Sequence, residues 1–296
     1  MDFVDDLMNG VDQNDSQNPS GAVSSGPNRH VDDDSLASTR AVVLAGGRGT
    51  RLAPYTSVLP KPLMPIGDRA ILEIVVEQLE LHGVRDITLC VGYLAHLIRS
   101  VFDNRANGHV NIRYVHEREA LGTAAPLRLV DDLDETFLVM NGDVLTTLDY
   151  RALIRHHRQA SNAVTIATRE RTFKVDYGVL GVENGTTSAR IVRFDEKPEL
   201  HSTVSMGIYV FEPRVLDYVP PDEHFDFPEL VQSLLRRGEP VGAYLFDGPW
   251  FDIGREHDHA RAVEAWMNGE LNGMGGAQER GAPSVERPAI VSHWSV

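Results

Sequence analysis

Short apolar runs alternate with segments of helical periodicity along most of the chain. The first such run, residues 41–45, is apolar throughout and stops at glycines, as expected of a buried strand. In the segment that ends at Gly83, apolar residues recur at helical spacing: Ile71, Leu72, Val75, Val76 and Leu79. This spacing predicts an amphipathic helix that the glycine terminates.

Further elements follow the same two patterns. Strands are expected at residues 86–91, 112–115, 136–140, 163–168, 190–194, 204–211 and 241–246. Helices are expected at residues 94–102, 149–159, 227–237 and 255–266. Alternating strands and helices imply a mostly parallel sheet with helices on both faces, and the strand-rich later part implies some antiparallel strands in that sheet. We therefore predict a Rossmann-like three-layer α/β/α fold with a mixed sheet.

The two ends of the chain lack these patterns. Residues 1–39 are rich in Asp, Asn, Ser and Gly, and contain too few large apolar residues to offset the entropy lost on ordering. We expect a disordered acidic arm there, either a solvated tail or a segment that binds a partner. Residues 269–296 are rich in glycine and proline, and we expect a flexible tail. The folded domain is therefore assigned to residues 40–268.

Composition and charge exclude several classes of protein. The 296 residues include 43 acidic and 28 basic side chains, for a net charge of −15, whereas a nucleic-acid-binding protein needs a basic surface. No apolar stretch approaches the roughly 18 residues of a membrane span, and the acidic N-terminus is unlike a signal peptide. The single cysteine, Cys90, is expected to be a buried, unreactive thiol. We expect a cytoplasmic protein with no nucleic-acid or membrane partner.

The loop after the first strand combines glycines with arginines. Gly46, Gly47 and Gly49 leave backbone N–H groups accessible to phosphates, and Arg48 and Arg51 add positive charge. The spacing matches neither a Walker A loop nor a G-x-G-x-x-G loop. Two arginines within a glycine loop of an acidic protein indicate a polyphosphate site, because a guanidinium fork binds two oxygens at once.

A lysine between two prolines follows that loop. Pro60 and Pro62 stiffen the backbone on either side of Lys61, which suits a lysine that presents its charge at a fixed point. Together, the loop and this segment resemble the opening signature of the sugar-1-phosphate nucleotidylyltransferases, also called nucleotide-sugar pyrophosphorylases. The resemblance covers residues 40–268 and is greatest to members similar to mannose-1-phosphate guanylyltransferase.

The resemblance implies a nucleotide-diphospho-sugar transferase type of fold and a Mg²⁺-assisted reaction. In that reaction a sugar 1-phosphate attacks the α-phosphorus of a nucleoside triphosphate, and pyrophosphate leaves. Since the attacking oxygen is already anionic, catalysis requires in-line positioning and charge neutralisation rather than a general base. The resemblance assigns catalytic roles to Arg51, Lys61 and Lys197. It assigns nucleotide binding to Leu44, Ala45, Gly46, Gly47, Arg48, Gly49 and Thr50.

Two aspartates are candidate Mg²⁺ ligands. Asp143 follows the strand expected at residues 136–140, and a carboxylate at the C-terminal end of a strand is well placed to hold Mg²⁺. The resemblance identifies Asp143 with a metal ligand of the family. It assigns the second ligand to Asp252, which lies in the sequence WFDIG at residues 250–254.

The resemblance implies that residues from several separate segments bind the acceptor sugar phosphate. Lys197 is the expected partner of its phosphate, and Glu196 the expected partner of its hydroxyls. The other expected contacts are Asn141, Gly178, Ser205 and Trp250. Serine at position 205 departs from the asparagine of many family members. The sugar is therefore left open among mannose, glucose, a heptose and an analogue from a specialised pathway.

Residues 117–127 bear on the choice of nucleotide. Their sequence, EREALGTAAPL, is similar to the Leu-Gly-Thr-Ala-Gly-Pro stretch of guanylyl members of the family. We therefore expect GTP, bound in part by Glu117, Gly122 and Thr123. Another nucleoside triphosphate is the alternative.

Two other functions are weighed against this one. A glycosyltransferase of similar fold would need an Asp-x-Asp metal motif, and the sequence at residues 141–143, NGD, lacks the first aspartate. A sensor that binds a nucleotide sugar without turnover is the second alternative, although every position expected to be catalytic is filled. The resemblance also implies a homo-oligomer, either a dimer or a tetramer.

Overall fold

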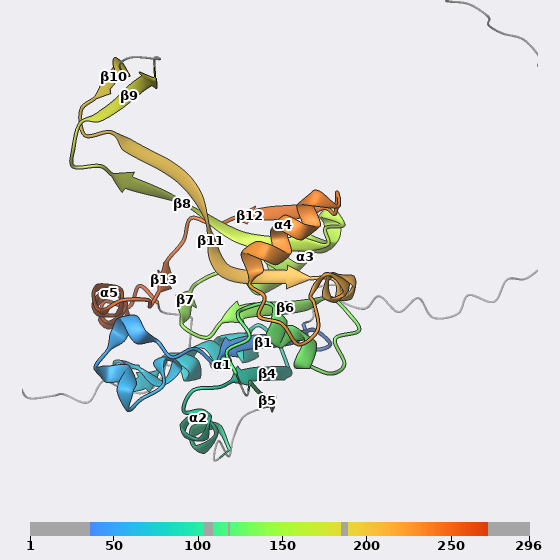
Figure 1. Ribbon diagram of the computed structural model, residues 1–296. Helices are drawn as coiled ribbons and strands as arrows, with labels where there is room; N and C mark the ends of the chain where they lie inside the picture. The colour runs from blue at the N-terminus through green and yellow to red at the C-terminus, as the bar shows by residue number, and fades with distance from the viewer. Residues whose placement is uncertain (1–35, 104–108, 118, 185–188, 272–296) are drawn as a thin grey trace, which may run out of the picture. The chain divides into compact units, whose positions relative to one another are not determined.

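The computed structural model describes residues 36–103, 109–117, 119–184 and 189–271 (Figure 1). Residues 1–35 of the expected N-terminal arm and residues 272–296 of the expected tail lie outside the described residues. Leu36 and Leu271 are buried in the hydrophobic core, and Thr39 is buried as well. Within the described residues, buried positions therefore extend a few residues beyond both ends of the expected domain.

A seven-stranded mixed sheet forms the centre of the described fold. Its strands are β1 (Arg40–Ala45), β4 (Asp86–Val91), β5 (Asn111–His116), β6 (Phe137–Asn141), β8 (Val164–Lys174), β11 (Glu199–Phe211) and β12 (Val241–Leu245). Their order in the sheet is β12-β8-β11-β6-β1-β4-β5. Parallel pairs join β1 to β4 and β6, β4 to β5, and β8 to β12. Only β11 pairs antiparallel within the described sheet, with β6 and β8, so the mostly parallel mixed sheet is confirmed.

Helices cover both faces of this sheet. They are α1 (Ile71–Leu81), α2 (Ala95–Phe102), α3 (Tyr150–Ala160), α4 (Phe227–Arg236), α5 (Glu256–Met267) and the 3₁₀ helix η4 (Ala125–Leu129). Successive residues of β1 divide between two cores: Ala41 and Val43 pack with α1, α2, α3 and α5, whereas Val42 packs with α4 and η4. A strand buried on both faces is typical of a sheet between two helical layers. The predicted three-layer fold and its helices are confirmed.

Strands β8 and β11 are longer than the sequence pattern indicates. Their inner halves lie in the sheet, whereas their outer halves pair with each other as a ribbon of mostly exposed residues. A hairpin of β9 (Val179–Asn184) and β10 (Ala189–Asp195) follows that ribbon (Figure 1). We refer to the described residues between 169 and 204 as the arm. The outer halves escaped prediction because strands exposed on both faces show no apolar alternation.

Several short elements complete the fold. Two pairs of short antiparallel strands are β2 (Pro65–Ile66) with β3 (Arg69–Ala70), and β7 (Val144–Thr146) with β13 (Trp250–Asp252). The other 3₁₀ helices are η1 (Thr50–Leu52), η2 (Tyr55–Ser57), η3 (Lys61–Leu63) and η5 (Pro213–Tyr218). Two or three residues are too few to show a period, so the sequence did not indicate the short strands. Within the described ranges, no helix is both long and apolar enough to cross a membrane.

Candidate active site

The glycine-rich loop lies where three neighbouring strands end. Leu44 and Ala45 end β1, Gly46, Gly47, Arg48 and Gly49 form the loop, and Thr50 begins η1. Gly46 O accepts a hydrogen bond at 3.2 Å from Tyr93 N, just after β4. Leu44 O accepts one at 2.8 Å from Gly142 N, just after β6. Because ligands of open α/β sheets bind at the carboxyl ends of strands, the loop stands at the edge where a ligand is expected.

Glycine is required at position 49 by its conformation and by its neighbours. Gly49 has a φ of 62°, in the left-handed region, and a Cβ atom there would lie 2.9 Å from Lys61 Cβ. Thr56 Oγ1 donates a hydrogen bond to Gly49 O at 2.9 Å. The glycine-rich loop is thereby packed directly against the lysine that lies between two prolines.

Lys61 and the two candidate metal ligands lie together. Lys61 begins η3, and its Nζ atom forms an ion pair with Asp143 Oδ2. The two side chains are only 12% and 18% exposed. The pKa of Asp252 is raised, first by burial and next by the negative charge of Asp143, while Lys61 and Arg51 act to lower it. Residues from four separate segments thus share one electrostatic environment.

A short strand ladder aligns the two aspartates. In the pairing of β7 with β13, Asp252 lies opposite the residue that follows Asp143. Ile253 N donates a hydrogen bond to Asp143 O at 3.1 Å. Thr146 Oγ1 donates to Pro249 O at 2.9 Å at the other end of the ladder. Backbone pairing therefore sets the position of both carboxylates.

The paired carboxylates fit a divalent cation. Mg²⁺ prefers hard oxygen ligands, and one or two carboxylates are the usual protein share of its coordination shell. The repulsion that raises the pKa of Asp252 is relieved when a cation lies between the two carboxylates. Asp143 and Asp252 are therefore the residues that would hold the metal.

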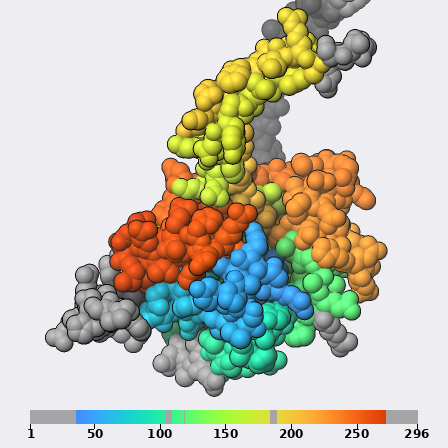
Figure 2. Space-filling view, turned by 60° about the vertical axis from the view of Figure 1, so that its left-hand side comes forward, coloured from blue at the N-terminus to red at the C-terminus, as the bar shows by residue number. Residues whose placement is uncertain are grey.

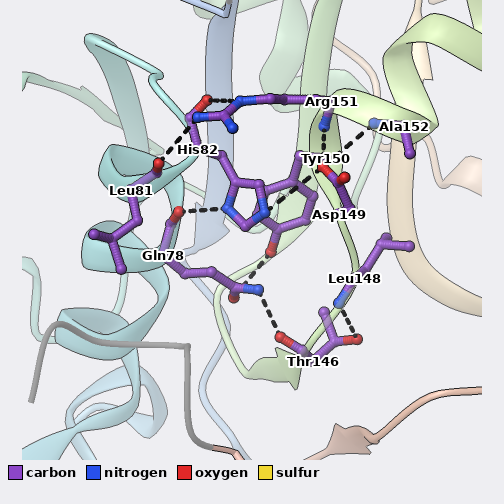
Figure 3. A network of polar contacts seen from close by, with 9 residues as sticks. All are labelled: Gln78, Leu81, His82, Thr146, Leu148, Asp149, Tyr150, Arg151 and Ala152. Atoms are coloured by element: carbon purple, nitrogen blue, oxygen red, sulfur yellow. Dashed lines mark hydrogen bonds and ion pairs between the residues drawn. The ribbon is translucent and has the colours of Figure 1, made fainter. Parts of the chain in front are cut away.

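A buried polar network lies beneath this ladder (Figure 3). Gln78, on α1 and 1% exposed, donates from Nε2 to Thr146 O at 2.6 Å. Its Oε1 accepts a hydrogen bond at 3.1 Å from the hydroxyl of Tyr150, the first residue of α3. Arg151 Nε donates to His82 O at 2.9 Å, at the end of α1. The network ties α1, β7 and α3 together and so supports the ladder that carries the aspartates.

The two arginines of the loop segment take different positions. The guanidinium of Arg51 lies against Gly254, two residues after Asp252. The guanidinium of Arg48 lies over the ring of Tyr93, 5.7 Å from its centroid, in a cation–π arrangement. Both arginines are exposed, so both place positive charge at the accessible rim of the loop.

Glu117 faces the start of the same loop. It directly follows β5, and its backbone N–H donates to Val91 O at 2.8 Å. Its carboxyl group lies so close to Gly46 that a Cβ atom at that position would overlap Oε1. Burial raises the pKa of Glu117, while a hydrogen bond with the backbone of Leu121 acts to lower it. The structure thus brings Glu117 to the first glycine of the loop.

Gly122 and Thr123 lie against the start of α4. Gly122 has a φ of 90°, and a Cβ atom there would lie 2.7 Å from Phe225 O. Thr123 donates from both N and Oγ1 to Asp226 Oδ1, each at 2.9 Å, and its Oγ1 accepts from Phe227 N at 2.9 Å. Thr123 therefore stabilises the N-terminus of α4 together with the N-cap Asp226. Contact of Gly122 and Thr123 with a nucleotide stays a prediction.

Asn141, Ser205 and Trp250 meet around an irregular part of β11. The pairing of β11 with β8 shifts register after Ser205, and a Cβ atom at Gly207, whose φ is 74°, would lie 2.6 Å from Asn141 Nδ2. Trp250 Nε1 donates to a backbone carbonyl of β11 at 3.0 Å. Ser205 Oγ donates to Tyr209 Oη at 3.1 Å and accepts from Gly207 N at 3.2 Å. The hydroxyl of Ser205 is thus engaged within its own strand.

Gly178, Glu196 and Lys197 belong to the arm. A Cβ atom at Gly178 would lie 2.7 Å from Phe194 Cζ and 3.4 Å from Glu196 Oε2, so the structure brings Gly178 and Glu196 together. Lys197 lies in the turn between β10 and β11, is exposed and has a φ of 46°. Among the described residues, no hydrogen bond or ion pair joins Lys197 to the aspartate pair.

Three residues near the aspartates escaped the sequence analysis. Arg171 and Arg261 line a pocket, together with Trp250, Phe251, Asp252 and Asp258. Neither arginine carries a sequence signal, because one lies within a strand and the other within an amphipathic helix.

Gln78 does carry a sequence signal, since it falls on the apolar face of α1, where a polar side chain needs a buried partner.

The chain is similar to known proteins in both sequence and fold. The family described as Nucleotidyl transferase matches residues 40–268. The chain belongs to the nucleotidyl transferase family. Among solved structures, this nucleotidyl transferase is similar to HddC from Yersinia pseudotuberculosis complexed with GMP-PN, at 26% identity and a TM-score of 0.58, over 77% of this chain and 99% of that chain. The similarity confirms the nucleotide-diphospho-sugar transferase type of fold.

Curated relatives of this nucleotidyl transferase are named for different nucleotides. A UTP–glucose-1-phosphate uridylyltransferase of Synechocystis sp. is 33% identical over 259 residues, which cover 79% of this chain and 65% of the relative. Mannose-1-phosphate guanyltransferase beta-A of Xenopus laevis is 33% identical over 226 residues, which cover 74% of this chain and 62% of the relative. The chain thus spans less than two thirds of the length of these curated relatives.

Replacement of Gln78 tests the support of the ladder. Gln78→Ala leaves the carbonyl of Thr146 and the hydroxyl of Tyr150 without their buried partner, and is expected to lower the free energy of unfolding by about 1–3 kcal/mol. Denaturant unfolding followed by circular dichroism measures the change. The control is Gln159→Ala, at an exposed position of α3, with an expected change below about 0.5 kcal/mol. Equal unfolding free energies for the two variants would contradict the role of Gln78.

Proposed function

We propose that this nucleotidyl transferase transfers a nucleoside monophosphate from a nucleoside triphosphate to a sugar 1-phosphate, with release of pyrophosphate. The observation that carries the proposal is the meeting of Lys61, Asp143 and Asp252 beside the glycine-rich loop. The names of the curated relatives, a sugar-1-phosphate uridylyltransferase and a guanyltransferase, support it. We assign the reaction to residues 40–268 as the catalytic domain.

The proposed reaction forms one P–O bond and breaks another. An oxygen of the sugar 1-phosphate bonds to the α-phosphorus, and the bond from that phosphorus to the bridging oxygen of pyrophosphate breaks, with the electron pair leaving on that oxygen. Because the nucleophile is already anionic, the protein removes no proton. Its task is to hold two anionic groups in line and to neutralise their charge.

Residues of the loop and of η3 carry this task on the triphosphate side. The backbone N–H groups of the three glycines and the guanidinium of Arg48 are assigned to the β- and γ-phosphates. Arg51 and Lys61 are assigned to the charge that develops on the leaving pyrophosphate. Fixed cations lower the barrier because they need no reorganisation during the reaction. Asp143 and Asp252 would hold Mg²⁺, which supplies further positive charge at the triphosphate when bound.

We propose GTP as the nucleotide, because Glu117 offers a carboxyl group beside the loop. Guanine presents two adjacent donors, N1–H and the N2 amino group, whereas uracil presents one N–H between two carbonyl oxygens. A carboxylate accepts two parallel N–H donors at once. The GMP-PN complex of HddC and the guanyltransferase relative support this choice, and the uridylyltransferase relative makes UTP the alternative.

The acceptor sugar is assigned to the segments of the arm that link β8 to β9 and β10 to β11, and to the irregular part of β11. Glu196 offers a carboxylate to sugar hydroxyls, and Gly178 beside it leaves room for a sugar ring. Asn141 and Trp250 are assigned to the inner side of this region, and Lys197 to the phosphate. The hydroxyl of Ser205 donates to Tyr209 and accepts from Gly207, which leaves one lone pair to accept from a sugar hydroxyl, so Ser205 stays a proposed contact of the sugar.

We also propose a homo-oligomer with a dimer contact at the β9–β10 hairpin. One face of this hairpin carries four apolar side chains that are 45% to 63% exposed: Leu180, Val182, Ile191 and Phe194. The other face carries the opposed charges of Glu183 and Arg190. A two-stranded hairpin alone is only marginally stable in water. Burial of its apolar face against another protein surface would therefore stabilise it. A second copy offers the same apolar face in a self-complementary contact.

A pyrophosphate-release assay tests the reaction. We expect release in Mg²⁺ for a pair drawn from GTP, ATP, UTP, CTP or dTTP and from the 1-phosphates of mannose, glucose or N-acetylglucosamine. Asp143→Asn is expected to lower kcat about 10²- to 10³-fold, the scale of losing one preorganised electrostatic group. Asp134→Asn, which changes an exposed aspartate, should keep wild-type activity. Nucleotide-sugar binding without any release would overturn the proposal in favour of a sensor.

A charge-neutral replacement tests the assignment of the base. Glu117→Gln keeps one acceptor but turns an N–H toward the guanine donors. We expect KM for GTP to rise roughly 10- to 100-fold, the loss of a charge-assisted hydrogen bond of about 1.5–3 kcal/mol. Glu119→Gln is the control, at an exposed position two residues away. A wild-type enzyme that prefers UTP, or a Glu117→Gln variant with unchanged KM for GTP, would refute the assignment.

A charge placed on the apolar face tests the dimer contact. Light scattering on a size-exclusion column should give a wild-type mass well above the 32.8 kDa of one chain. Ile191→Glu buries a charge in the proposed contact and should shift the protein toward 32.8 kDa. Glu183→Gln, on the opposite face, should not. A wild-type protein that already elutes as a single chain would rule out the contact.

A further inference from the structure

Two arginines of the pocket between the arm, β13 and α5 have no role in the function proposed so far. Arg171 enters it from the base of the arm, and Arg261 and Asp258 enter it from α5. Figure 2 shows these two regions side by side on one face of the described fold. Asp252, one of the two candidate metal ligands, lines the same pocket. No residue of the glycine-rich loop is among its described lining residues.

Both arginines of the pocket are oriented by aromatic rings rather than by acidic side chains. The guanidinium of Arg171 lies over the ring of Trp250, 5.6 Å from its centroid, and that of Arg261 lies over the ring of Phe251, 5.9 Å away. Within the described part of the chain, neither guanidinium forms an ion pair. The carboxylate of Asp258 pairs instead with His257 at 3.0 Å. Stacking orients a guanidinium and leaves its edge donors available to a ligand.

Two such guanidinium groups in one pocket fit a phosphate monoester. Each presents N–H donors in a planar fork that matches two phosphate oxygens. We propose that Arg171 and Arg261 bind the phosphate group of the acceptor. This inference rests on the proposed function for the identity of the acceptor. It assigns to the two arginines a part in phosphate binding that the resemblance implied only for Lys197.

The position of the pocket agrees with the geometry of the reaction. In-line displacement requires the attacking phosphate to approach the α-phosphorus from the side opposite the leaving pyrophosphate. The triphosphate side is formed by the glycine-rich loop, whereas the pocket is formed by the arm, β13 and α5, and Asp252 belongs to both. The arm that carries Arg171 also carries Gly178 and Glu196, which are assigned to the sugar.

The positive charge of the two arginines also favours the approach of the acceptor phosphate. The acceptor phosphate must approach a triphosphate that is itself strongly negative, in a protein of net charge −15. Two cations at the point of approach offset this repulsion. Lys197 is exposed and, among the described residues, forms no hydrogen bond or ion pair with the aspartate pair. Arg171 and Arg261 line one pocket with Asp252, whereas Lys61 and Arg51, which also act on Asp252, are assigned to the triphosphate side.

Steady-state kinetics with Arg171→Gln and Arg261→Gln test the proposal. Each change should raise KM for the sugar 1-phosphate at least 10-fold, while KM for the nucleoside triphosphate changes less than twofold. Arg190→Gln is the matched control, since it removes an exposed arginine of the same arm outside the pocket. An unchanged KM for the sugar 1-phosphate would overturn the assignment. A rise only in KM for the nucleoside triphosphate would also overturn it and move the arginines to the triphosphate side.

A binding experiment separates this proposal from the proposed function. Methyl phosphate, a monoester without a sugar, is titrated into the full-length protein with Mg²⁺ and followed by calorimetry. We expect Arg171→Gln and Arg261→Gln to weaken its binding at least 10-fold and Arg190→Gln to leave it unchanged. Arginine-dependent binding without pyrophosphate release for any substrate pair would support the phosphate pocket and overturn the proposed function. Pyrophosphate release with no arginine-dependent binding would support the proposed function and overturn the phosphate pocket.

Discussion

Two aspartates that repel each other have to be held side by side, and the rest of the site depends on this constraint. Burial raises the pKa of Asp252 because it removes water that solvates the charged carboxylate, and the negative charge of Asp143 raises it further. The β7–β13 ladder supplies the proximity through backbone pairing, and Ile253 N secures it on Asp143 O. The ion pair of Lys61 with Asp143 offsets part of the charge. A divalent cation fits the same pair of carboxylates for the same electrostatic reason.

The ladder is short, and its position depends on the packing beneath it. Gln78 reaches from α1 to the carbonyl of Thr146, and Tyr150 at the start of α3 completes the connection. These groups are buried, so each hydrogen bond that is lost would leave a polar atom without water or partner. The hydrophobic core on that face of the sheet holds α1 and α3 in place. Core packing is thereby linked to the geometry of the aspartates.

A second consequence of the fold is a local reversal of charge. The protein is strongly acidic as a whole, yet the loop segment, η3, the arm and α5 bring arginines and a lysine to the edge where the carboxyl ends of β1, β4 and β6 meet. Local cations in a site act on a bound anion more strongly than distant surface charges, which salt screens. The overall charge therefore does not prevent binding of anionic substrates.

The sequence by itself determined the fold class and the candidate residues of the loop, because periodicity, glycines and prolines act locally. Apolar periods located the helices and the inner strands, and Gly49 and Lys61 stood out through their neighbours in the chain. Only the tertiary structure decided that Lys61 touches Asp143, that the β7–β13 ladder aligns Asp143 with Asp252, and that Arg171 and Arg261 enter one pocket. The outer halves of β8 and β11 escaped as well, since strands exposed on both faces show no apolar period. These features depend on which residues far apart in the sequence face each other. A local sequence pattern does not determine such contacts.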